Sequence, residues 1–562
     1  MTGFDDIIVG GGSAGCVLAN RLSTDPTRRV LLIEAGVDIP PGAVPAEISD
    51  SYPMALFHGE RYLWPGLRVT ASRTADGTPT VRGYEQGRVM GGGSSINVQA
   101  ANRGLPRDFD EWAKLGATGW GWDGVLPYFR KLETDLDCDG PLHGKSGPIP
   151  IRRVQQDAWP PYAHAAAAAF SASKLRYHLD QNGEFGDGLF PPAFSNAGDR
   201  RVSTASGYLT AEVRRRGNLT VLAEATVVGM LVSGARADGV VIRQRDSGEA
   251  TVRGRRVILA AGALQSPAIL LRAGIGPGEQ LQALGIAVQI ERSGVGRNLR
   301  DHPALTFCQY LPAALRLPDH IRRASLLAMR YSSGDESGSA SDMYVTASAR
   351  AGWHALGNRL ALYFLWCNRP HSSGSLHLAS PDPGTYPDID LNLLSDGSDM
   401  RRMAAGVRHL IGLVVCEALN RNPGDVFPAT FSQRIKRLSL ISGTNRRITA
   451  VLGRMLDVPA PLRRLILRTF MLGGTDLTEI LADDRQLDAF IRRNVFGVWH
   501  PVGTCRMGLD ADAVVNPTGR VIGSENIWVA DASVMPRLPT ANTNIPTIMV
   551  AEKIGDGLMR GG

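Results

Sequence analysis

The first forty residues alternate between apolar runs and glycine-rich turns. Residues 7–9 form a β-branched run, apolar side chains recur at helical spacing from Val17 to Leu22, and a second apolar run at 30–33 ends at Glu34. A short apolar run predicts a buried strand, and recurrence every three or four residues predicts a helix. The pattern therefore predicts one βαβ unit with two parallel strands at the start of the chain.

The remaining apolar runs predict two kinds of sheet. Strands are expected at 219–231, 240–245 and 256–262, then at 341–347, 359–367, 375–378, 495–507 and 527–531, with a last helix at 546–559. From about residue 303 the alternation of strand and helix stops, which favours a mostly antiparallel second unit. The expected fold class is α/β with an α+β second part, and residues 36–86 are interpreted as an extended arm with loops rather than a core element.

Glycines at fixed spacing occupy the turn of the βαβ unit. Gly10, Gly12 and Gly15 form G-x-G-x-x-G, and Glu34 follows Gly15 by nineteen positions. In a dinucleotide site the first glycine makes the turn, the second admits a diphosphate, and the third lets the helix pack on the strand. An acid at position 34 can accept from a ribose hydroxyl and disfavours a 2′-phosphate, so FAD or NAD is expected rather than NADP. A glycine-rich turn without a ligand is the alternative.

Two further small-residue segments are expected near the same ligand. Residues 87–97 hold three adjacent glycines followed by two serines, and residues 256–262 end in Ala-Ala-Gly. Backbone without bulky side chains can lie against a flat polar ligand. For residues 87–97 a flexible linker is the alternative.

Size and composition set the broad class. The 562 residues imply more than one domain, and 43% hydrophobic with 20% charged residues is ordinary for a globular protein. No run of 18 apolar residues predicts a membrane span, and the N-terminus lacks the features of a secretory signal, so a cytoplasmic location is expected. The six cysteines are scattered, which favours neither a metal site nor disulfides.

The net charge of +7 comes from one segment. Residues 434–468 hold nine basic side chains and one acid, which is +8, so the rest of the chain is about −1 by subtraction. The basic balance therefore does not indicate nucleic-acid binding. Two amphipathic helices are predicted in 434–470, from 448–456 and from 462–470. A solvated face packed on the protein is the favoured interpretation, and contact with a membrane surface or a lid is the alternative.

These motifs resemble those of the GMC (glucose–methanol–choline) oxidoreductases along the whole chain. Residues 87–97 and 262–276 are similar to the two family signatures, although Met90 replaces another aliphatic residue and Ala273 replaces serine. Within the family, residues 84–88, 102–108, 497–501 and 539–547 most resemble bacterial 5-hydroxymethylfurfural oxidases.

The resemblance implies a discontinuous FAD-binding domain and a substrate domain whose sheet roofs the flavin. The expected FAD domain comprises 1–160, 214–302 and 516–562, and the substrate domain comprises 161–213 and 303–515, with approximate boundaries. Some relatives bond the flavin covalently through a histidine, but Ile96 occupies that position here. The FAD is therefore expected to be non-covalent.

The resemblance also implies that His500 and Asn544 face the substrate at flavin N5. A histidine suits the removal of an alcohol proton because its ordinary pKa is about 6.5. The alternatives are a structural histidine and, for Asn544, a cap on the final helix, whose N-terminus is expected to stabilise the negative charge of the reduced flavin.

The remaining expected site residues share small size, backbone amides or aromatic rings. The expected cofactor contacts are Gly10, Gly12, Ser13, Ala14, Gly15, Glu34, Ala35, Met90, Gly92, Gly93, Ser94, Asn97, Val98, Val227, Ala261, Gly262, Trp499, Asp531, Ala532, Asn542, Thr543, Asn544 and Thr547. The expected substrate pocket holds Phe364, Trp366, Cys367 and Trp499. On residue type alone the pocket residues are more often core.

The function implied by the resemblance is oxidation of primary furanic or aryl alcohols. The products would be aldehydes and, through hydrated aldehydes, carboxylic acids, with molecular oxygen reduced to hydrogen peroxide. Two rivals are a quinone-linked, membrane-associated alcohol dehydrogenase and a flavin-containing hydroxynitrile lyase. An NAD-linked enzyme would leave the glycine loop at 91–93 without a role. The sequence predicts no metal and does not fix the oligomeric state.

Overall fold

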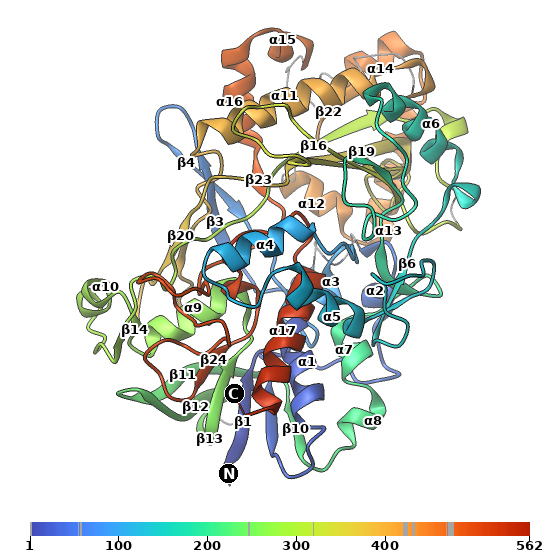
Figure 1. Ribbon diagram of the computed structural model, residues 1–562. Coiled ribbons are helices and arrows are strands. Elements are labelled where there is room, and N and C mark those ends of the chain that lie inside the picture. Colours follow the sequence, from blue (N-terminus) through green and yellow to red (C-terminus); the bar gives the residue numbers. More distant parts are fainter. Residues whose placement is uncertain are drawn as a thin grey trace.

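Two large sheets, one above the other in Figure 1, build the protein. The computed structural model describes residues 3–53, 56, 59–244, 248–318, 320–419, 425–429, 433–467, 469 and 477–561. Arg468 and Phe470, which belong to the predicted basic helices, and the side chain of Arg434 lie outside the described part. Both chain ends lie beside the lower sheet.

The lower sheet is parallel at its centre. Its strands are β1 (Phe4–Val9), β2 (Val30–Ile33), β10 (Leu219–Leu222), β13 (Gly248–Leu259) and β24 (Ile527–Val529), joined by antiparallel β11 (Ala225–Ser233) and β12 (Arg236–Gln244). The order is β10-β2-β1-β13-β12-β11, with β24 paired to β13. Val9 pairs with Ile33 and Leu259, Ile33 with Leu222, and Leu259 with Val529. The carboxyl ends of all five parallel strands therefore meet at one edge.

Glycines set the turn between β1 and α1 (Ser13–Leu22). Gly10 has φ +102°, and a Cβ there would lie 2.6 Å from the carbonyl oxygen of Ala260. A Cβ on Gly15 would lie 1.8 Å from the carbonyl oxygen of Gly10. Only glycine accommodates both approaches. The helix thus packs directly on its strand, beside α17 (Asn544–Met559).

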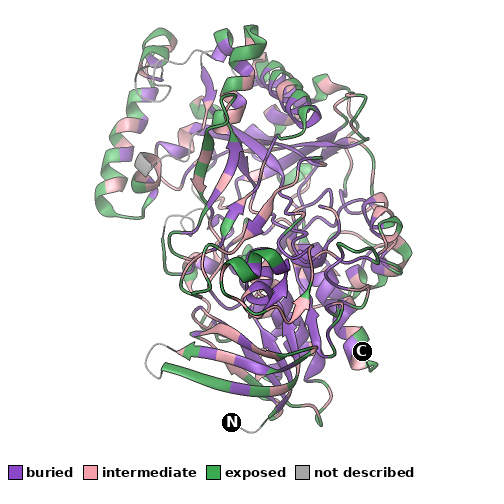
Figure 2. Cartoon of the chain, turned by 90° about the vertical axis from the view of Figure 1, so that its left-hand side faces the viewer, coloured by how far each residue is buried: buried purple, intermediate pink, exposed green. Residues whose placement is uncertain are grey.

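The upper sheet is antiparallel throughout. Its strands are β7 (Gly188–Phe190), β16 (Pro303–Tyr310), β17 (Ser325–Tyr331), β18 (Met343–Ser348), β19 (Leu360–Cys367), β22 (Val426–Pro428) and β23 (Phe496–Gly497). The order is β22-β16-β19-β18-β17-β7, with β23 paired to β16. Its strands are almost wholly buried, as the purple ribbons of Figure 2 show. Helix α11 (Gly397–Val414) covers one face, where Gly406 lies against Met343 and Leu365.

The remaining elements connect and cover the two sheets. The helices are α2 (Ala46–Ser49), α3 (Gly93–Ile96), α4 (Pro106–Lys114), α5 (Trp122–Leu132), α6 (Pro161–Phe170), α7 (Thr204–Tyr208), α8 (Ala211–Arg214), α9 (Gly262–Arg272), α10 (Gly278–Ala283), α12 (Gln433–Ser439), α13 (Gly443–Leu456), α14 (Ala460–Ile466), α15 (Leu477–Ala482) and α16 (Asp484–Asn494). Smaller sheets use β3 (Arg68–Arg73), β4 (Pro79–Gly83), β5 (Glu133–Asp135), β6 (Ile149–Arg152), β8 (Phe194–Ala197), β9 (Arg200–Arg201), β14 (Ile275–Gly276), β15 (Ile290–Glu291), β20 (Ser375–His377) and β21 (Asp388–Asp390). No described helix is both long and apolar enough to cross a bilayer.

The α/β class with an antiparallel second part is confirmed, and two local predictions are wrong. Residues 36–86 contain the hairpin β3–β4, which joins β21 in a four-stranded sheet. Residues 495–507 form a strand only at 496–497 and continue as a loop, because the paired edge of β16 ends there. The domain boundaries stay a prediction, although every strand of the upper sheet falls within 161–213 or 303–515.

A buried ion cluster fixes the connection between β5 and β6. Two arginines, Arg103 and Arg153, and His143 face the carboxylates of Glu133, Asp135 and Asp180. Nδ1 of His143 lies 3.0 Å from Asp135, and Nε2 lies 3.1 Å from Asp180. Burial lowers the pKa of His143, but the close approach of the three carboxylates outweighs burial and raises that pKa from 6.5 to about 10. With His143 protonated, three positive and three negative charges balance.

The stability of the protein should therefore depend on pH through His143. Because the folded pKa exceeds the unfolded one, its stabilising contribution is complete below pH 6.5 and is lost as the pH rises through about 10. We expect the wild type to melt at a higher temperature than His143→Gln at pH 6, and the difference to shrink steadily toward pH 10. Thermal melts of both proteins across this range check it, and a pH-independent difference would contradict it.

Candidate active site

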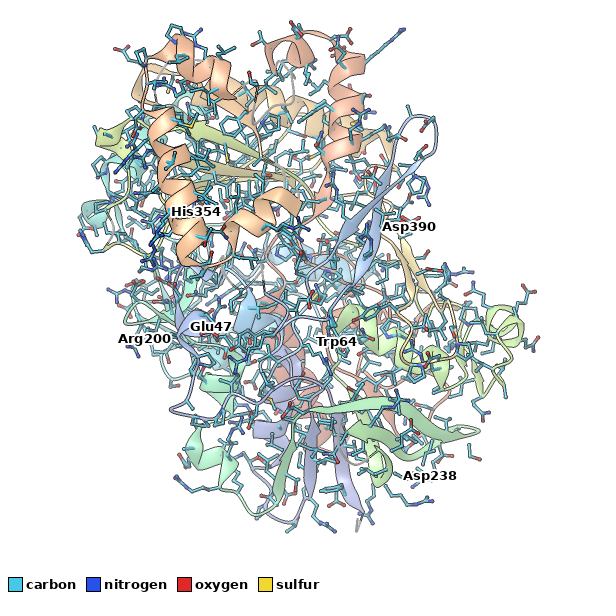
Figure 3. All side chains as sticks on the ribbon, turned by 180° about the vertical axis from the view of Figure 1, so that it is seen from behind. Glu47, Trp64, Arg200, Asp238, His354 and Asp390 are labelled. Carbon is cyan, nitrogen blue, oxygen red and sulfur yellow. The ribbon has the colours of Figure 1, made fainter. Side chains whose placement is uncertain are left out.

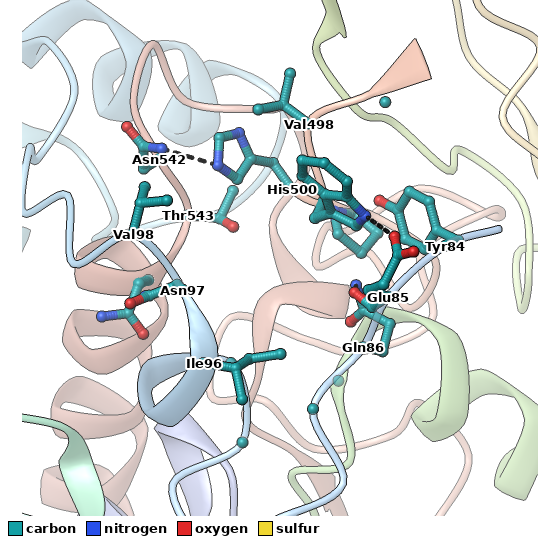
Figure 4. A pocket seen from close by; sticks show the side chains of 18 of the residues that line it. Tyr84, Glu85, Gln86, Ile96, Asn97, Val98, Val498, His500, Asn542 and Thr543 are labelled. Carbon is teal, nitrogen blue, oxygen red and sulfur yellow. Dashed lines mark hydrogen bonds between the residues drawn. The ribbon is translucent and has the colours of Figure 1, made fainter. Parts of the chain in front are cut away.

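A cavity of about 690 Å³ lies between the two sheets. Its floor holds the ends of the parallel strands at Val9, Ile33 and Ala260, and its roof holds Phe364 and Trp366 of β19. Carboxyl ends of parallel strands are where open α/β sheets bind their ligands. Figure 4 shows the side chains that point into this space near His500 and Asn542.

The floor has the shape of a cradle for a ligand that makes close backbone contacts. A Cβ on Gly93 or Gly262 would have no protein atom within 4 Å, and on Gly12 none nearer than 3.9 Å. All three residues line the cavity. The N-terminus of α1, where Gly12 is the cap and no side chain caps the helix, opens onto the same space. Free N–H groups at such a position attract a diphosphate.

Glu34 lies at the end of β2 in the same floor. Its carboxylate accepts hydrogen bonds from the backbone N–H groups of Gly11 and Gly36, each at 2.8 Å. Burial raises the pKa of Glu34 to about 7, and these hydrogen bonds oppose the rise. The acid therefore fixes the glycine turn while it faces the cavity.

Most of the expected cofactor contacts come together around the cavity. Lining it are Gly10, Gly12, Ser13, Ala14, Glu34, Ala35, Gly92, Gly93, Asn97, Val98, Val227, Ala261, Gly262, Trp499, Asp531, Ala532, Asn542, Thr543, Asn544 and Thr547. Three expected contacts lie behind this lining. Gly15 packs on Gly10, Met90 is buried against Gly11, and Ser94 donates to the carbonyl of Gly91. These three shape the floor without facing the cavity.

The backbone around His500 is held by one carboxylate. Asp301 accepts from the backbone N–H of His500 at 3.0 Å, from that of His302 at 2.8 Å, and from the hydroxyl of Tyr84. Burial raises the pKa of Asp301 to about 7, against the effect of these hydrogen bonds. Trp499, the residue before His500, has φ +57°, and its indole N–H donates to Glu85 at 3.0 Å. The loop that carries His500 is therefore anchored on both sides.

A chain of hydrogen bonds determines which nitrogen of His500 is free. Nε2 of His302 lies 3.1 Å from the carbonyl oxygen of Asn368 and must donate, because a carbonyl only accepts. Nδ1 of neutral His302 is then an acceptor, so Nδ1–H of His500, 2.9 Å away, donates to it. Nε2 of His500 consequently carries a lone pair, which accepts from the amide of Asn542 at 3.0 Å.

Burial keeps both imidazoles uncharged. It lowers the pKa of His302 to about 3. Burial and then the neighbouring His302 lower the pKa of His500 well below 6.5. Low dielectric disfavours the charged form of each ring, and two adjacent positive rings would repel. His500 therefore offers an unprotonated Nε2 to the cavity across the neutral pH range.

The polar partner of His500 is Asn542 rather than Asn544, whose expected role at the substrate stays a prediction. Helix α17 begins at Asn544. The side-chain carbonyl of Asn544 accepts from the hydroxyl of Ser13 at 2.8 Å. That hydrogen bond ties α17 to the start of α1. Asn542 precedes the helix by two residues and so reaches His500. Asn544 also lines the cavity.

The roof of the cavity is aromatic, with one correction to the expected set. Phe364 and Trp499 both lie close to Phe496, in tilted or edge contacts, and Trp366 stacks on Tyr344 at 4.6 Å. Cys367 was expected here, but successive residues of β19 point to opposite faces. Its thiol lies on the other face, buried with Tyr363 and Leu365 beneath α11.

Several residues of the site were not predicted from the sequence. Asp301 and His302 end the connection into β16, and Asn368 follows β19, so the three are far apart in sequence. The one available signal was the succession of Asp301 and His302 directly before a buried strand. Tyr84 and Glu85 lie in the stretch interpreted as a loop. Their hydrogen bonds to Asp301 and Trp499 depend on the meeting of the two sheets.

Together the dinucleotide cradle and the neutral base beneath an aromatic roof define a cofactor-dependent oxidoreductase. Models of the GMC oxidoreductase family match residues 4–304 and 370–551. The chain belongs to the GMC oxidoreductases.

The relatives cover the whole chain. The chain is 44% identical over 566 residues to the 5-(hydroxymethyl)furfural oxidase of Methylovorus sp. (strain MP688). This alignment covers 99% of this chain and 98% of that protein. It is 32% identical to an oxygen-dependent choline dehydrogenase of Paraburkholderia phymatum, over 98% of this chain and 92% of that protein. The solved structure of pyridoxine 4-oxidase from "Mesorbium loti" superposes with a TM-score of 0.81 and 27% identity, over 100% of both chains.

A side chain at Gly93 should exclude the cofactor without harming the fold. Because a Cβ there enters open cavity, we expect Gly93→Val to fold with the melting temperature of the wild-type apoprotein and to retain little FAD. Gly412→Val is the matched control. A Cβ on Gly412 would also meet nothing within 4 Å, but Gly412 lies on α11, outside the cavity. The ratio of flavin to protein absorbance measures retention. Full occupancy in Gly93→Val would contradict the assignment.

Proposed function

We propose that the protein is an FAD-dependent oxidase of primary furanic and aryl alcohols. The observation that carries the proposal is the unprotonated Nε2 of His500, held at the boundary between the cradle and an aromatic roof. The 44% identity to a 5-(hydroxymethyl)furfural oxidase over the whole chain supports the substrate class.

The residues of the floor fit FAD. Gly12 and the N-terminus of α1 would hold the diphosphate, and Glu34 would accept from a ribose hydroxyl. Gly93 and Gly262 leave room for the flat ring system. Ile96 carries no group that could bond to the flavin, which supports non-covalent binding. Bound FAD supplies the acceptor for the hydride that leaves the carbinol carbon, and molecular oxygen takes up the electrons to give hydrogen peroxide.

His500 would take the hydroxyl proton. Its low pKa keeps it unprotonated before the reaction, and Nδ1–H remains bonded to His302 while Nε2 accepts. The alcohol hydroxyl would displace the amide of Asn542 from Nε2. That amide is then free to donate to the alcohol oxygen and hold it as negative charge develops. The two side chains thus share one substrate atom.

The same residues account for a second oxidation. An aldehyde in water adds a water molecule and forms a gem-diol, which again presents an O–H and a C–H on one carbon. His500 would take a hydroxyl proton from this diol as it does from the alcohol. Each oxidation consumes one oxygen molecule and releases one hydrogen peroxide, so an alcohol would yield its carboxylic acid in two steps.

Removal of His500 should stop the reaction and spare the cofactor site. We expect His500→Ala to bind FAD fully. A furanic alcohol should reduce the flavin of this variant at least about a hundredfold more slowly than that of the wild type, because a positioned base usually contributes a rate factor of this size. For the wild type, reduction should not slow on acidification from pH 8 to 6.5, because the pKa of His500 is well below 6.5. Anaerobic stopped-flow loss of the yellow flavin colour measures both.

The same experiment separates the rival functions. Admission of air to the reduced wild type should restore the colour with stoichiometric peroxide. Slow reoxidation by air with fast turnover on a quinone would favour a dehydrogenase. Absence of any reduction by alcohols would favour a lyase. Near-normal reduction of His500→Ala would remove His500 from the mechanism.

Asn542 and Asn544 should differ in what they support. Because Asn542 contacts His500, we expect Asn542→Ala to reduce the rate of flavin reduction by roughly a hundredfold at unchanged FAD content. Asn544→Ala removes the hydrogen bond to Ser13, so it should lower FAD retention or melting temperature and affect the rate less. Stopped-flow rates and flavin occupancy of the two variants, compared side by side, test this. The opposite order of rates would restore Asn544 as the partner of His500.

A further inference from the structure

Exposed apolar side chains concentrate in one segment of the surface. Of thirteen large apolar side chains that are exposed in the described chain, seven lie between residues 440 and 465. They form what we call the apolar patch: Leu440, Ile441, Ile448, Val451, Met455, Leu462 and Leu465. Single exposed apolar residues need no explanation, but a concentration of this kind marks an interaction site.

The apolar stripe of helix α13 is packed along only one of its edges. Leu456 is buried, and Leu452 packs beside it in the cluster that includes Tyr310 and Leu360. Ile448, Val451 and Met455 are exposed by 42%, 59% and 39%. Their spacing of three and four residues places them in one stripe, which adjoins the packed residues Leu452 and Leu456. The favoured interpretation, a solvated face packed on the protein, does not account for the exposure of these three apolar side chains.

Exposed arginines without acidic partners lie in the same segment of the chain as this stripe. Arg437, Arg446, Arg447, Arg454 and Arg464 are exposed, and none has a described carboxylate within ion-pair distance. The one acid of the segment, Asp457, is already paired with Arg316 and Arg359 from elsewhere in the chain. The patch thus combines exposed apolar side chains with uncompensated positive charge, the combination that binds at the surface of an anionic bilayer.

The patch begins at the edge of the cavity. Ile435, Lys436 and Ser439 of α12 line it, and Leu440 and Ile441 follow directly. The carbonyl of Ser439 accepts from the indole of Trp353, which also lines the cavity. Helix α12 contacts α13, and α13 contacts α14. In Figure 3 the helices drawn beside His354 occupy the side of the molecule that lies at the back of Figure 1.

We propose that the surface formed by the apolar patch and its five arginines binds peripherally to anionic lipid bilayers. The apolar side chains enter the boundary between headgroups and acyl chains, and the arginines contact the lipid phosphates. Positive charge without acidic partners favours this occupant over a second copy of the chain, whose matching face would bring like charges together. The proposal is independent of the reaction, since no residue of the patch faces His500.

Vesicle binding by the holoenzyme tests the proposal. We expect the enzyme to sediment with vesicles of phosphatidylcholine and phosphatidylglycerol at low salt, to stay in solution with phosphatidylcholine alone, and to be released as salt rises. Arg447→Gln/Arg454→Gln should weaken binding roughly 25-fold, because each arginine near an anionic surface contributes about fivefold. Ile448→Ser/Val451→Ser/Met455→Ser should also abolish most of the binding.

Matched controls keep the outcome interpretable. Arg485→Gln/Arg520→Gln and Leu179→Ser/Leu509→Ser change exposed residues outside the patch and should bind vesicles like the wild type. All variants should keep the wild-type rate with a water-soluble alcohol, which shows that they fold. Three results would overturn the proposal: no binding to anionic vesicles, equal binding to neutral vesicles, or patch variants that bind normally. A dimer in light scattering that only the triple serine variant dissociates would also overturn it.

Discussion

The carbonyl oxygen of Asn368 imposes a direction on the hydrogen bonds that run from His302 through His500 to Asn542. A carbonyl cannot donate, so His302 must, and the protons of both rings are ordered as a result. No charge is needed to hold this order, which is why two imidazoles can lie edge to edge in the interior. The base is thus prepared by backbone placement, since Asn368 follows β19 and His302 precedes β16, and those two strands pair.

The meeting of the two sheets explains why a single cavity combines a backbone cradle with an aromatic roof. Parallel strands deliver turns and helix N-termini at one edge, whereas the antiparallel sheet presents a wide side-chain surface. Burial beneath that surface desolvates His500 and so lowers its pKa. The aromatic enclosure is therefore what keeps His500 unprotonated. Asp301 connects the loop of His500 to Tyr84, because its carboxylate accepts from the backbone N–H of His500 and from the hydroxyl of Tyr84.

Local pattern predicted the dinucleotide floor well and the hydrogen-bond partners poorly. The roles of Gly10 and Gly15 follow from one turn and one helix, so sequence spacing suffices to assign them. The choice between Asn542 and Asn544 depends on where α17 begins, within a margin of two residues. Sequence patterns do not locate an element's end that finely. The misplacement of Cys367 has a similar origin, because one step along a strand reverses the face.

Trp499 occupies a backbone conformation that residues other than glycine and asparagine rarely adopt. The left-handed region costs an ordinary side chain roughly 1–2 kcal/mol, and here the indole compensates through Glu85 and the aromatic roof. The backbone conformation at residue 499 therefore favours some substitutions over others. Valine, isoleucine and threonine would meet the steepest backbone penalty, whereas asparagine and glycine would enlarge the pocket and relieve strain at once. Any diversification of this enzyme through residue 499 should therefore begin from small or amide side chains.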